Sequence, residues 1–267
     1  MVPARASSLA ALEPHMTFPL WAYPLLFLTG FVAGLVDAVA GGGGVLTLPV
    51  LLNTGLPVGV VLGTNKLQAT FGSVSAAWSY LRSGIVSFRA CLPGVVLTFV
   101  GSLAGAWAVQ RIDGRILGDL IPWLLAAILA YTVFKPKLGE APATPRLPAR
   151  VFFLVFGLGL GFYDGFFGPG VGSFWTIALV VVLGRDFVGA TGVTKLMNAA
   201  SNLAALIFFL VIGQVHLPVG LTMGVGQMVG ARVGARLVVT RGARLVRPLF
   251  IVMVTLVLAR LLWVRFG

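Results

Sequence analysis

Four ionisable side chains fall inside long apolar stretches of the sequence: Asp37, Lys66, Asp164 and Lys195. At the centre of a membrane-spanning helix, a charged residue costs about 2.5–3.5 kcal/mol on insertion scales, so such residues are rare and mark functional sites by default. Two acids and two bases can form structural ion pairs, and a lysine near a helix end can extend to the membrane surface. They can also form a binding site in which the lysines attract an anion.

The two aspartates need a separate role in such a site, because a carboxylate repels an anion. Asp37 and Asp164 can neutralise the lysines while the site is empty. Alternatively, each can take up a proton as the anion binds, since burial favours the neutral form of a carboxyl group. The sequence leaves both roles, ion pairing and proton coupling, open.

A glycine-rich turn follows each aspartate. The first turn contains Gly41, Gly42, Gly43 and Gly44, and the second contains Gly168, Gly170 and Gly172, with Pro169 between two of its glycines. Because successive glycines weaken a continuous helix, we predict that the first helix stops at Asp37 and that a new helix starts near Gly44. The free N–H groups and the positive dipole end of each restarted helix would then face a small anion.

Polar side chains on the following apolar segments are predicted to complete this anion site. They are Thr64, Asn65 and Gln68 around Lys66, and Thr194, Asn198, Ser201 and Asn202 around Lys195. Residues three or four positions apart share one face of a helix, so Lys195, Asn198 and Asn202 point the same way. Hydroxyl and amide groups can replace the water that an oxyanion loses when it binds.

The candidate residues occur twice because the chain contains an internal repeat. Asp164 follows Asp37 by 127 positions, and Lys195 follows Lys66 by 129. The pairs Gly101/Gly105 and Gly230/Gly234, which we expect to permit close helix packing, are also 129 positions apart. The predicted organisation is a tail (1–17), a first repeat (18–134), a cytoplasmic linker rich in proline and charge (135–150) and a second repeat (151–267).

The composition indicates the medium in which these repeats fold. Of the 267 residues, 58% are hydrophobic and 10% are charged, and the mean hydropathy is +1.02, which is too apolar for a soluble domain of this length. The apolar segments are 18–36, 44–53, 60–81, 91–110 and 116–134 in the first repeat, and 151–163, 172–184, 188–212, 218–240 and 246–264 in the second. We predict an all-α polytopic membrane protein of about eight to ten helices, in which the short second segment of each repeat is broken or re-entrant.

The distribution of basic residues predicts how the chain lies in the membrane. If the first two segments of a repeat end on the side where they began, three further crossings invert the second repeat relative to the first. With the linker inside the cell, most loop lysines and arginines also lie inside, as the positive-inside rule requires. The net charge of +12 then reflects orientation in the membrane, and we expect no nucleic-acid partner.

Other chemistries find little support in the sequence. Cys91 is the single cysteine, and the two histidines, His15 and His216, lie far apart in predicted loops. We therefore predict no metal site, no cofactor and no internal disulfide. The apolar segments offer no nucleophile beside a base, so we do not expect an enzyme.

The spacing of these motifs resembles the TauE/SafE (TSUP) family of bacterial membrane proteins. The resemblance rests on Gly34-x-x-Asp37-x-x-x-Gly41-Gly42-Gly43-Gly44, on Gly63-Thr64-x-Lys66, and on a degenerate second copy in which Pro169 and Val193 replace a glycine and a threonine. It implies an exporter of sulfite, sulfonates or other small organic anions in the bacterial inner membrane. Rocking of the repeats around a midplane site would perform this transport, and a homodimer is open as an assembly. An anion channel and a non-transporting membrane assembly factor are the alternatives.

Overall fold

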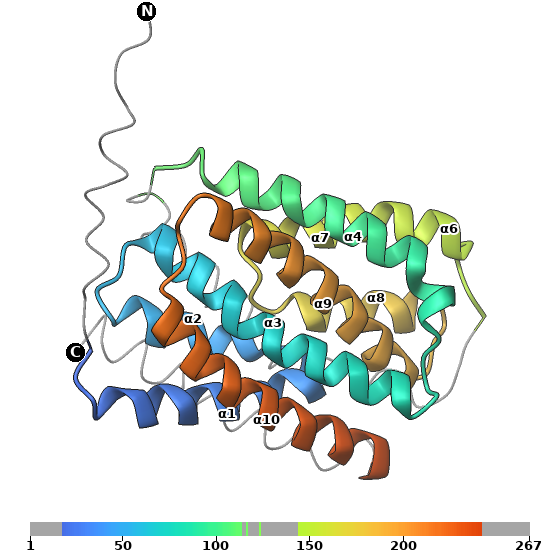
Figure 1. Ribbon diagram of the computed structural model, residues 1–267. Coiled ribbons are helices and arrows are strands. Elements are labelled where there is room, and N and C mark those ends of the chain that lie inside the picture. The colour runs from blue at the N-terminus through green and yellow to red at the C-terminus, as the bar shows by residue number, and fades with distance from the viewer. Residues whose placement is uncertain (1–17, 114–115, 117–122, 124–143, 242–267) are drawn as a thin grey trace, which may run out of the picture.

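The structure of the chain is a computed structural model that describes residues 18–113, 116, 123 and 144–241 (Figure 1). Within these residues the secondary structure is helical, without strands. The first repeat contributes α1 (Ala22–Ala40), α2 (Gly43–Leu52), α3 (Val58–Arg82) and α4 (Phe88–Val109). The second contributes α6 (Ala149–Phe152), a π-helical turn (Phe153–Gly157), α7 (Leu158–Phe166), α8 (Val171–Val181), α9 (Phe187–Val211) and α10 (Leu217–Arg241).

These helices correspond to the first four apolar segments predicted in each repeat. The fifth segments, 116–134 and 246–264, lie outside the described residues except for positions 116 and 123, as do the tail and most of the linker. In the described part of the chain, three continuous helical stretches are long and apolar enough to cross a membrane: Phe88–Val109, Ala149–Phe166 and Phe187–Val211. The predicted all-helical architecture is confirmed for the described residues.

The second helix of each repeat is short. The helix α2 has 10 residues and α8 has 11, so each rises about 15–17 Å, roughly half of a hydrocarbon layer of ~30 Å. The chain turns back at the breaks between α1 and α2 and between α7 and α8, and short loops then lead from α2 into α3 and from α8 into α9. The elements can be followed by their labels in Figure 1. The predicted interruption of the first span in each repeat is confirmed.

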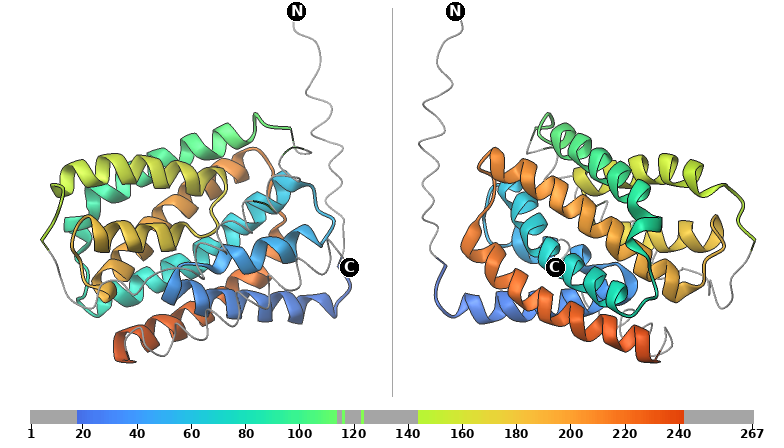
Figure 2. Two further views of the ribbon diagram at one scale, coloured as in Figure 1. Left: turned by 180° about the vertical axis from the view of Figure 1, so that it is seen from behind. Right: turned by 45° about the vertical axis from the view of Figure 1, so that its right-hand side comes forward.

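The helices are arranged in layers that small residues hold together. The pair α4 and α7 forms one outer layer, α1 and α10 form the other, and α3 and α9 cross between them (Figures 1 and 2). A Cβ atom at Gly101 or Gly105 would meet the backbone of α7, and one at Gly230 or Gly234 would meet the backbone of α1. The predicted packing role of these four glycines is confirmed.

The direction of each helix follows from the order of its contacts. Residues 27–38 of α1 meet residues 223–234 of α10 in rising order, so these helices are parallel. By the same criterion α4 is parallel to α7 and to α9, and α3 is parallel to α10. In contrast, α3 and α9 are antiparallel, since Gly63 lies beside Phe209 and Gly192 lies beside Tyr80. Within the described residues, α1, α3 and α10 thus run in one direction, and α4, α7 and α9 run in the other.

Candidate functional site

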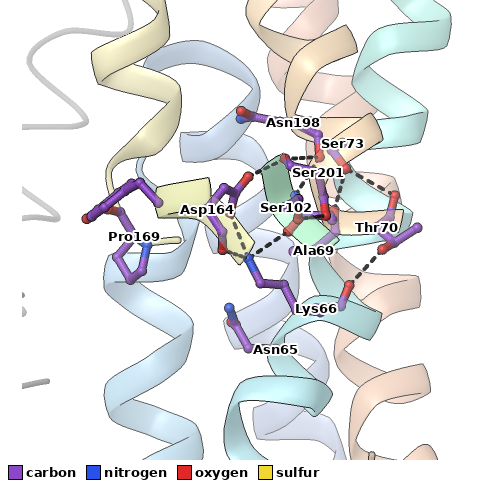
Figure 3. Close-up of polar contacts among 12 residues, drawn as sticks. Asn65, Lys66, Ala69, Thr70, Ser73, Ser102, Asp164, Pro169, Asn198 and Ser201 are labelled. Atoms are coloured by element: carbon purple, nitrogen blue, oxygen red, sulfur yellow. Dashed lines mark hydrogen bonds and ion pairs between the residues drawn. The ribbon is translucent and has the colours of Figure 1, made fainter. Parts of the chain in front are cut away.

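The four buried charges form two ion pairs, and each pair joins one repeat to the other. Lys66 Nζ lies 2.7 Å from Asp164 Oδ1, and Lys195 Nζ lies 3.1 Å from Asp37 Oδ2. Lys66 also donates to the backbone carbonyl of Asp164 in the last turn of α7 (Figure 3). Lys195 likewise donates to the backbone carbonyl of Asp37 in the last turns of α1. The lysines therefore sit at the negative ends of two helix dipoles as well as beside a carboxylate.

The ion pairs lie next to the two helix breaks that the glycines predict. In the first repeat α1 ends at Ala40, Gly41 adopts a left-handed conformation (φ 75°), and α2 begins at Gly43 after Gly42. In the second repeat α7 ends at Phe166, and Gly170 (φ 78°) immediately precedes α8. The prediction that the first helix stops at Asp37 was wrong by one turn, because a glycine with positive φ, and not the aspartate, ends the helix.

The two breaks contact each other at the centre of the bundle. A Cβ atom at Gly41 would lie 2.5 Å from the carbonyl carbon of Gly172, and one at Gly172 would lie 2.6 Å from Gly41 Cα. The next neighbours, Gly44 and Pro169, also face each other, since a Cβ atom at Gly44 would lie 3.3 Å from Pro169 Cα. Glycine is required at this crossing because the two backbones touch.

We expect Gly41→Ala to destabilise the protein by about 2–4 kcal/mol, because left-handed backbone strain adds to overpacking against Gly172. Gly55→Ala is the matched control: Gly55 has a similar φ of 78°, and a Cβ atom there would meet nothing within 4 Å. The apparent melting temperature in detergent should fall at least twice as far for Gly41→Ala as for Gly55→Ala. Equal decreases in melting temperature would show that the contact between Gly41 and Gly172 does not contribute to stability.

The environments of the two aspartates differ. Asp164 is 2% exposed, and its second carboxylate oxygen accepts a hydrogen bond from Ser201 (Figure 3). Asp37 is 13% exposed, and among the described residues its second oxygen accepts a single, long bond, 3.4 Å, from the N–H of Gly43 in the first turn of α2. The Asp37 carboxylate thus lies between Lys195 and the N-terminus of α2.

The polar residues around Lys66 form two separate groups. Asn65 and Gln68 join Thr47 of α2 in one buried cluster, with the Thr47 hydroxyl 2.7 Å and Gln68 Nε2 2.8 Å from Asn65 Oδ1. Thr64 points elsewhere, because its hydroxyl accepts the N–H of His216 at the start of α10. The first group joins α2 to α3 by side-chain hydrogen bonds, whereas Thr64 binds the backbone of the loop that precedes α10.

The polar residues around Lys195 approach the breaks more closely. Asn198 Nδ2 would lie 3.0 Å from a Cβ atom at Gly172, and Asn198 Oδ1 is buried without a hydrogen-bond partner in the described part of the chain. Asn202 Oδ1 lies 3.5 Å from Lys66 Nζ, so α9 supplies both Asn202 and Ser201 to the Lys66–Asp164 pair. The hydroxyl of Thr194 lies 3.1 Å from that of Thr176 in α8. Asn198 therefore lies at the first turn of α8, and its Oδ1 atom accepts no hydrogen bond from the described residues.

Three residues of this region were missed by the sequence reasoning. Thr47 and Thr176 brace the two short helices, and they are 129 positions apart, which is the offset of the repeat. That offset could have revealed them. Gln227 packs against Gly72 and has a buried Oε1 without a partner among the described residues. No signal in the sequence distinguishes Gln227 from an ordinary helix residue.

The geometry and the comparisons with known proteins together define the class of the protein. Apolar helices, interrupted spans and ion pairs between the repeats are features of a helical membrane transporter. Residues 26–261 match the family described as "Sulfite exporter TauE/SafE", and the chain belongs to that family.

Relatives from two bacteria and one plant agree with this assignment. A "Probable membrane transporter protein" of Haemophilus influenzae is 43% identical over 239 residues, 90% of this chain and 94% of the relative. The "Probable membrane transporter protein YfcA" of Escherichia coli K12 is 41% identical over 243 residues, 91% and 90% of the two chains. A "Sulfite exporter TauE/SafE family protein 5" of Arabidopsis thaliana is 32% identical over 82 residues, 30% of this chain and 18% of its own. No solved structure matches the chain.

Proposed function

We propose that this protein is a secondary transporter that exports small sulfur-containing or organic anions, such as sulfite and sulfonates, across the bacterial inner membrane. The single observation that carries the proposal is the meeting of two interrupted helices, each beside a buried lysine, at the centre of the bundle. The family description supplies the substrate class. The protein would act without a metal or cofactor, because charge on the lysines and helix dipoles suffices to bind an oxyanion.

The transport mechanism that we propose is alternating access of two inverted repeats. The opposite directions of corresponding helices support the inversion, and the short α2 and α8 support re-entrant hairpins that begin and end on one side. Among the described residues, the arginines gather at one end of the bundle: Arg82, Arg89, Arg146, Arg150, Arg185, Arg232, Arg236 and Arg241, against Arg111 at the other. The arginine-rich end is then cytoplasmic.

Anion binding must compete with the aspartates for the lysines. An oxyanion that approaches the first turn of α2 or α8 meets backbone N–H groups, and it gains a lysine only when a carboxylate releases it. Asp37 is the easier carboxylate to displace, because it is more exposed than Asp164 and its second oxygen is held by a long bond. We therefore assign the coupling proton to Asp37 and a structural role to Asp164.

This assignment predicts a specific defect for Asp37→Asn in proteoliposomes. For one proton per anion, a gradient of one pH unit drives about tenfold accumulation of anion, since 1.4 kcal/mol corresponds to a factor of ten. A symporter follows its gradients in either direction, so the wild type should accumulate radiolabelled sulfoacetate inside the vesicles when the outside is acidic. In the cell, the same coupling exports the anion when the outward anion gradient exceeds the inward proton gradient. Asp37→Asn should exchange sulfoacetate across the membrane but should not respond to the gradient, because the amide carries no proton.

The same vesicles distinguish the other functions. Flux that never saturates and gives single-channel currents would identify an anion channel. If purified protein moves neither sulfite nor sulfoacetate, the assembly role gains support. Gradient-driven accumulation by Asp37→Asn would refute the proton assignment while leaving anion transport intact.

A further inference from the structure

A recess at the arginine-rich end of the bundle lies between the C-terminal ends of α3 and α10. It has a volume of about 540 Å³ and is half open to the surroundings. Its lining residues are Trp78, Ser79, Arg82 and Ser83 from α3, and Arg232, Arg236, Val239 and Thr240 from α10. The recess is distant from the ion pairs, because Lys66 lies in the middle of α3, four helical turns before Arg82.

The recess concentrates positive charge without internal compensation. Arg82, Arg232 and Arg236 line it, and within the described residues none of the three forms an ion pair, since both ion pairs of that part lie at the helix breaks. Three guanidinium groups around one hollow repel each other unless an anion lies between them. The hydroxyls of Ser79, Ser83 and Thr240 also line the hollow, but each donates its proton to a backbone carbonyl of its own helix, so the arginines supply the hydrogen-bond donors for an anion.

An apolar surface leads directly to this basic recess. On α3 the exposed residues Val74 and Trp78 precede Arg82 at intervals of four, and on α10 the exposed residues Val225 and Val229 precede Arg232. Residues at these intervals lie on one face of a helix. The helices α3 and α10 are parallel neighbours, so the two apolar stripes run side by side and end at the arginines. Trp78, 58% exposed at this boundary, is the residue type that marks the membrane interface.

We propose that the recess binds the headgroup of an anionic phospholipid, with the acyl chains along the stripes of α3 and α10. Arginine suits a phosphate because its planar group donates two parallel hydrogen bonds. A soluble anion would satisfy the arginines but would leave the exposed valines and Trp78 without a partner. A second copy of the chain, related by a twofold axis, would bring arginines against arginines and is disfavoured on this face.

The test compares retention of lipid by purified protein in a neutral detergent. Native mass spectrometry with phosphatidylglycerol should show the wild type and Arg89→Gln retaining the lipid equally, because Arg89 is exposed at the same end but does not line the recess. The double variant Arg232→Gln/Arg236→Gln should bind roughly 25-fold more weakly, since each basic residue contributes about 1 kcal/mol at an anionic surface. Phosphatidylcholine should be retained weakly by all three proteins.

A second measurement needs no arginine variant. Phosphatidylglycerol carrying brominated acyl chains should quench the fluorescence of Trp78, measured as the difference between the wild type and Trp78→Phe. Equal retention by the double variant, equal competition by inorganic phosphate, or a dimer that shields Trp78 from the brominated lipid would overturn the proposal.

Discussion

Lys66→Ala should be the most destabilising single substitution at the helix breaks, at about 3–5 kcal/mol. The substitution leaves Asp164 as a buried carboxylate without its cation, and breaking a buried pair on one side costs this much. Ser201 continues to donate to Asp164, but a single hydroxyl does not replace an ammonium group. The expected readout is a large fall in the apparent melting temperature and in the yield of folded protein in detergent.

The double variant Lys66→Met/Asp164→Asn is the control for this prediction. It removes both charges and nearly conserves volume, so it should recover most of the lost stability. Lys195→Ala should cost less than Lys66→Ala, because Asp37 is 13% exposed and water can solvate it. If Lys66→Ala melted like the wild type, Asp164 would be neutral or hydrated and the structural role assigned to that pair would be wrong.

Removal of the Lys195 charge should weaken anion binding roughly tenfold to 150-fold without unfolding the protein. The variant Lys195→Gln/Asp37→Asn eliminates both members of the more exposed pair, so no buried charge is left alone. A hydrogen bond to a charged group contributes about 1.5–3 kcal/mol, which corresponds to a loss of affinity of roughly tenfold to 150-fold. Isothermal titration with sulfite and with sulfoacetate, compared with the wild type, measures this loss.

The matched comparison is Lys66→Met/Asp164→Asn, which removes the other pair. We expect it to bind more weakly than the wild type but better than Lys195→Gln/Asp37→Asn. Unchanged affinity in both double variants would mean that the anion binds away from the lysines. Equal losses in both would mean that the two repeats contribute equally, in conflict with the unequal environments of Asp37 and Asp164.

The features that the sequence could predict are those fixed by local chemistry. Four glycines in an apolar run weaken a continuous helix, and so a break next to these glycines could be predicted from the residue types. The packing of Gly101 and Gly105 followed from the need of small residues at a close helix contact. Repetition at a fixed offset identified Lys66 and Lys195 as corresponding residues.

The partners of these residues depend on tertiary packing and could not be predicted. A repeat offset matches Asp37 to Asp164, but it does not say that Lys195 crosses to Asp37 of the other repeat. Thr64 and Asn65 are adjacent in the same motif, yet helix rotation sends one to His216 and the other to Thr47. The end of α1 was predicted at Asp37 and not at Ala40, because only the backbone geometry shows which glycine adopts positive φ.

The most direct test of the anion site is a structure with selenite, an analogue of sulfite whose selenium scatters anomalously. The account predicts selenium density at the helix breaks, within hydrogen-bond reach of Lys195 Nζ and of backbone N–H groups in the first turn of α2 or α8, with the Asp37 carboxylate displaced. Density confined to the arginine recess, or a bound anion with both ion pairs intact, would contradict it.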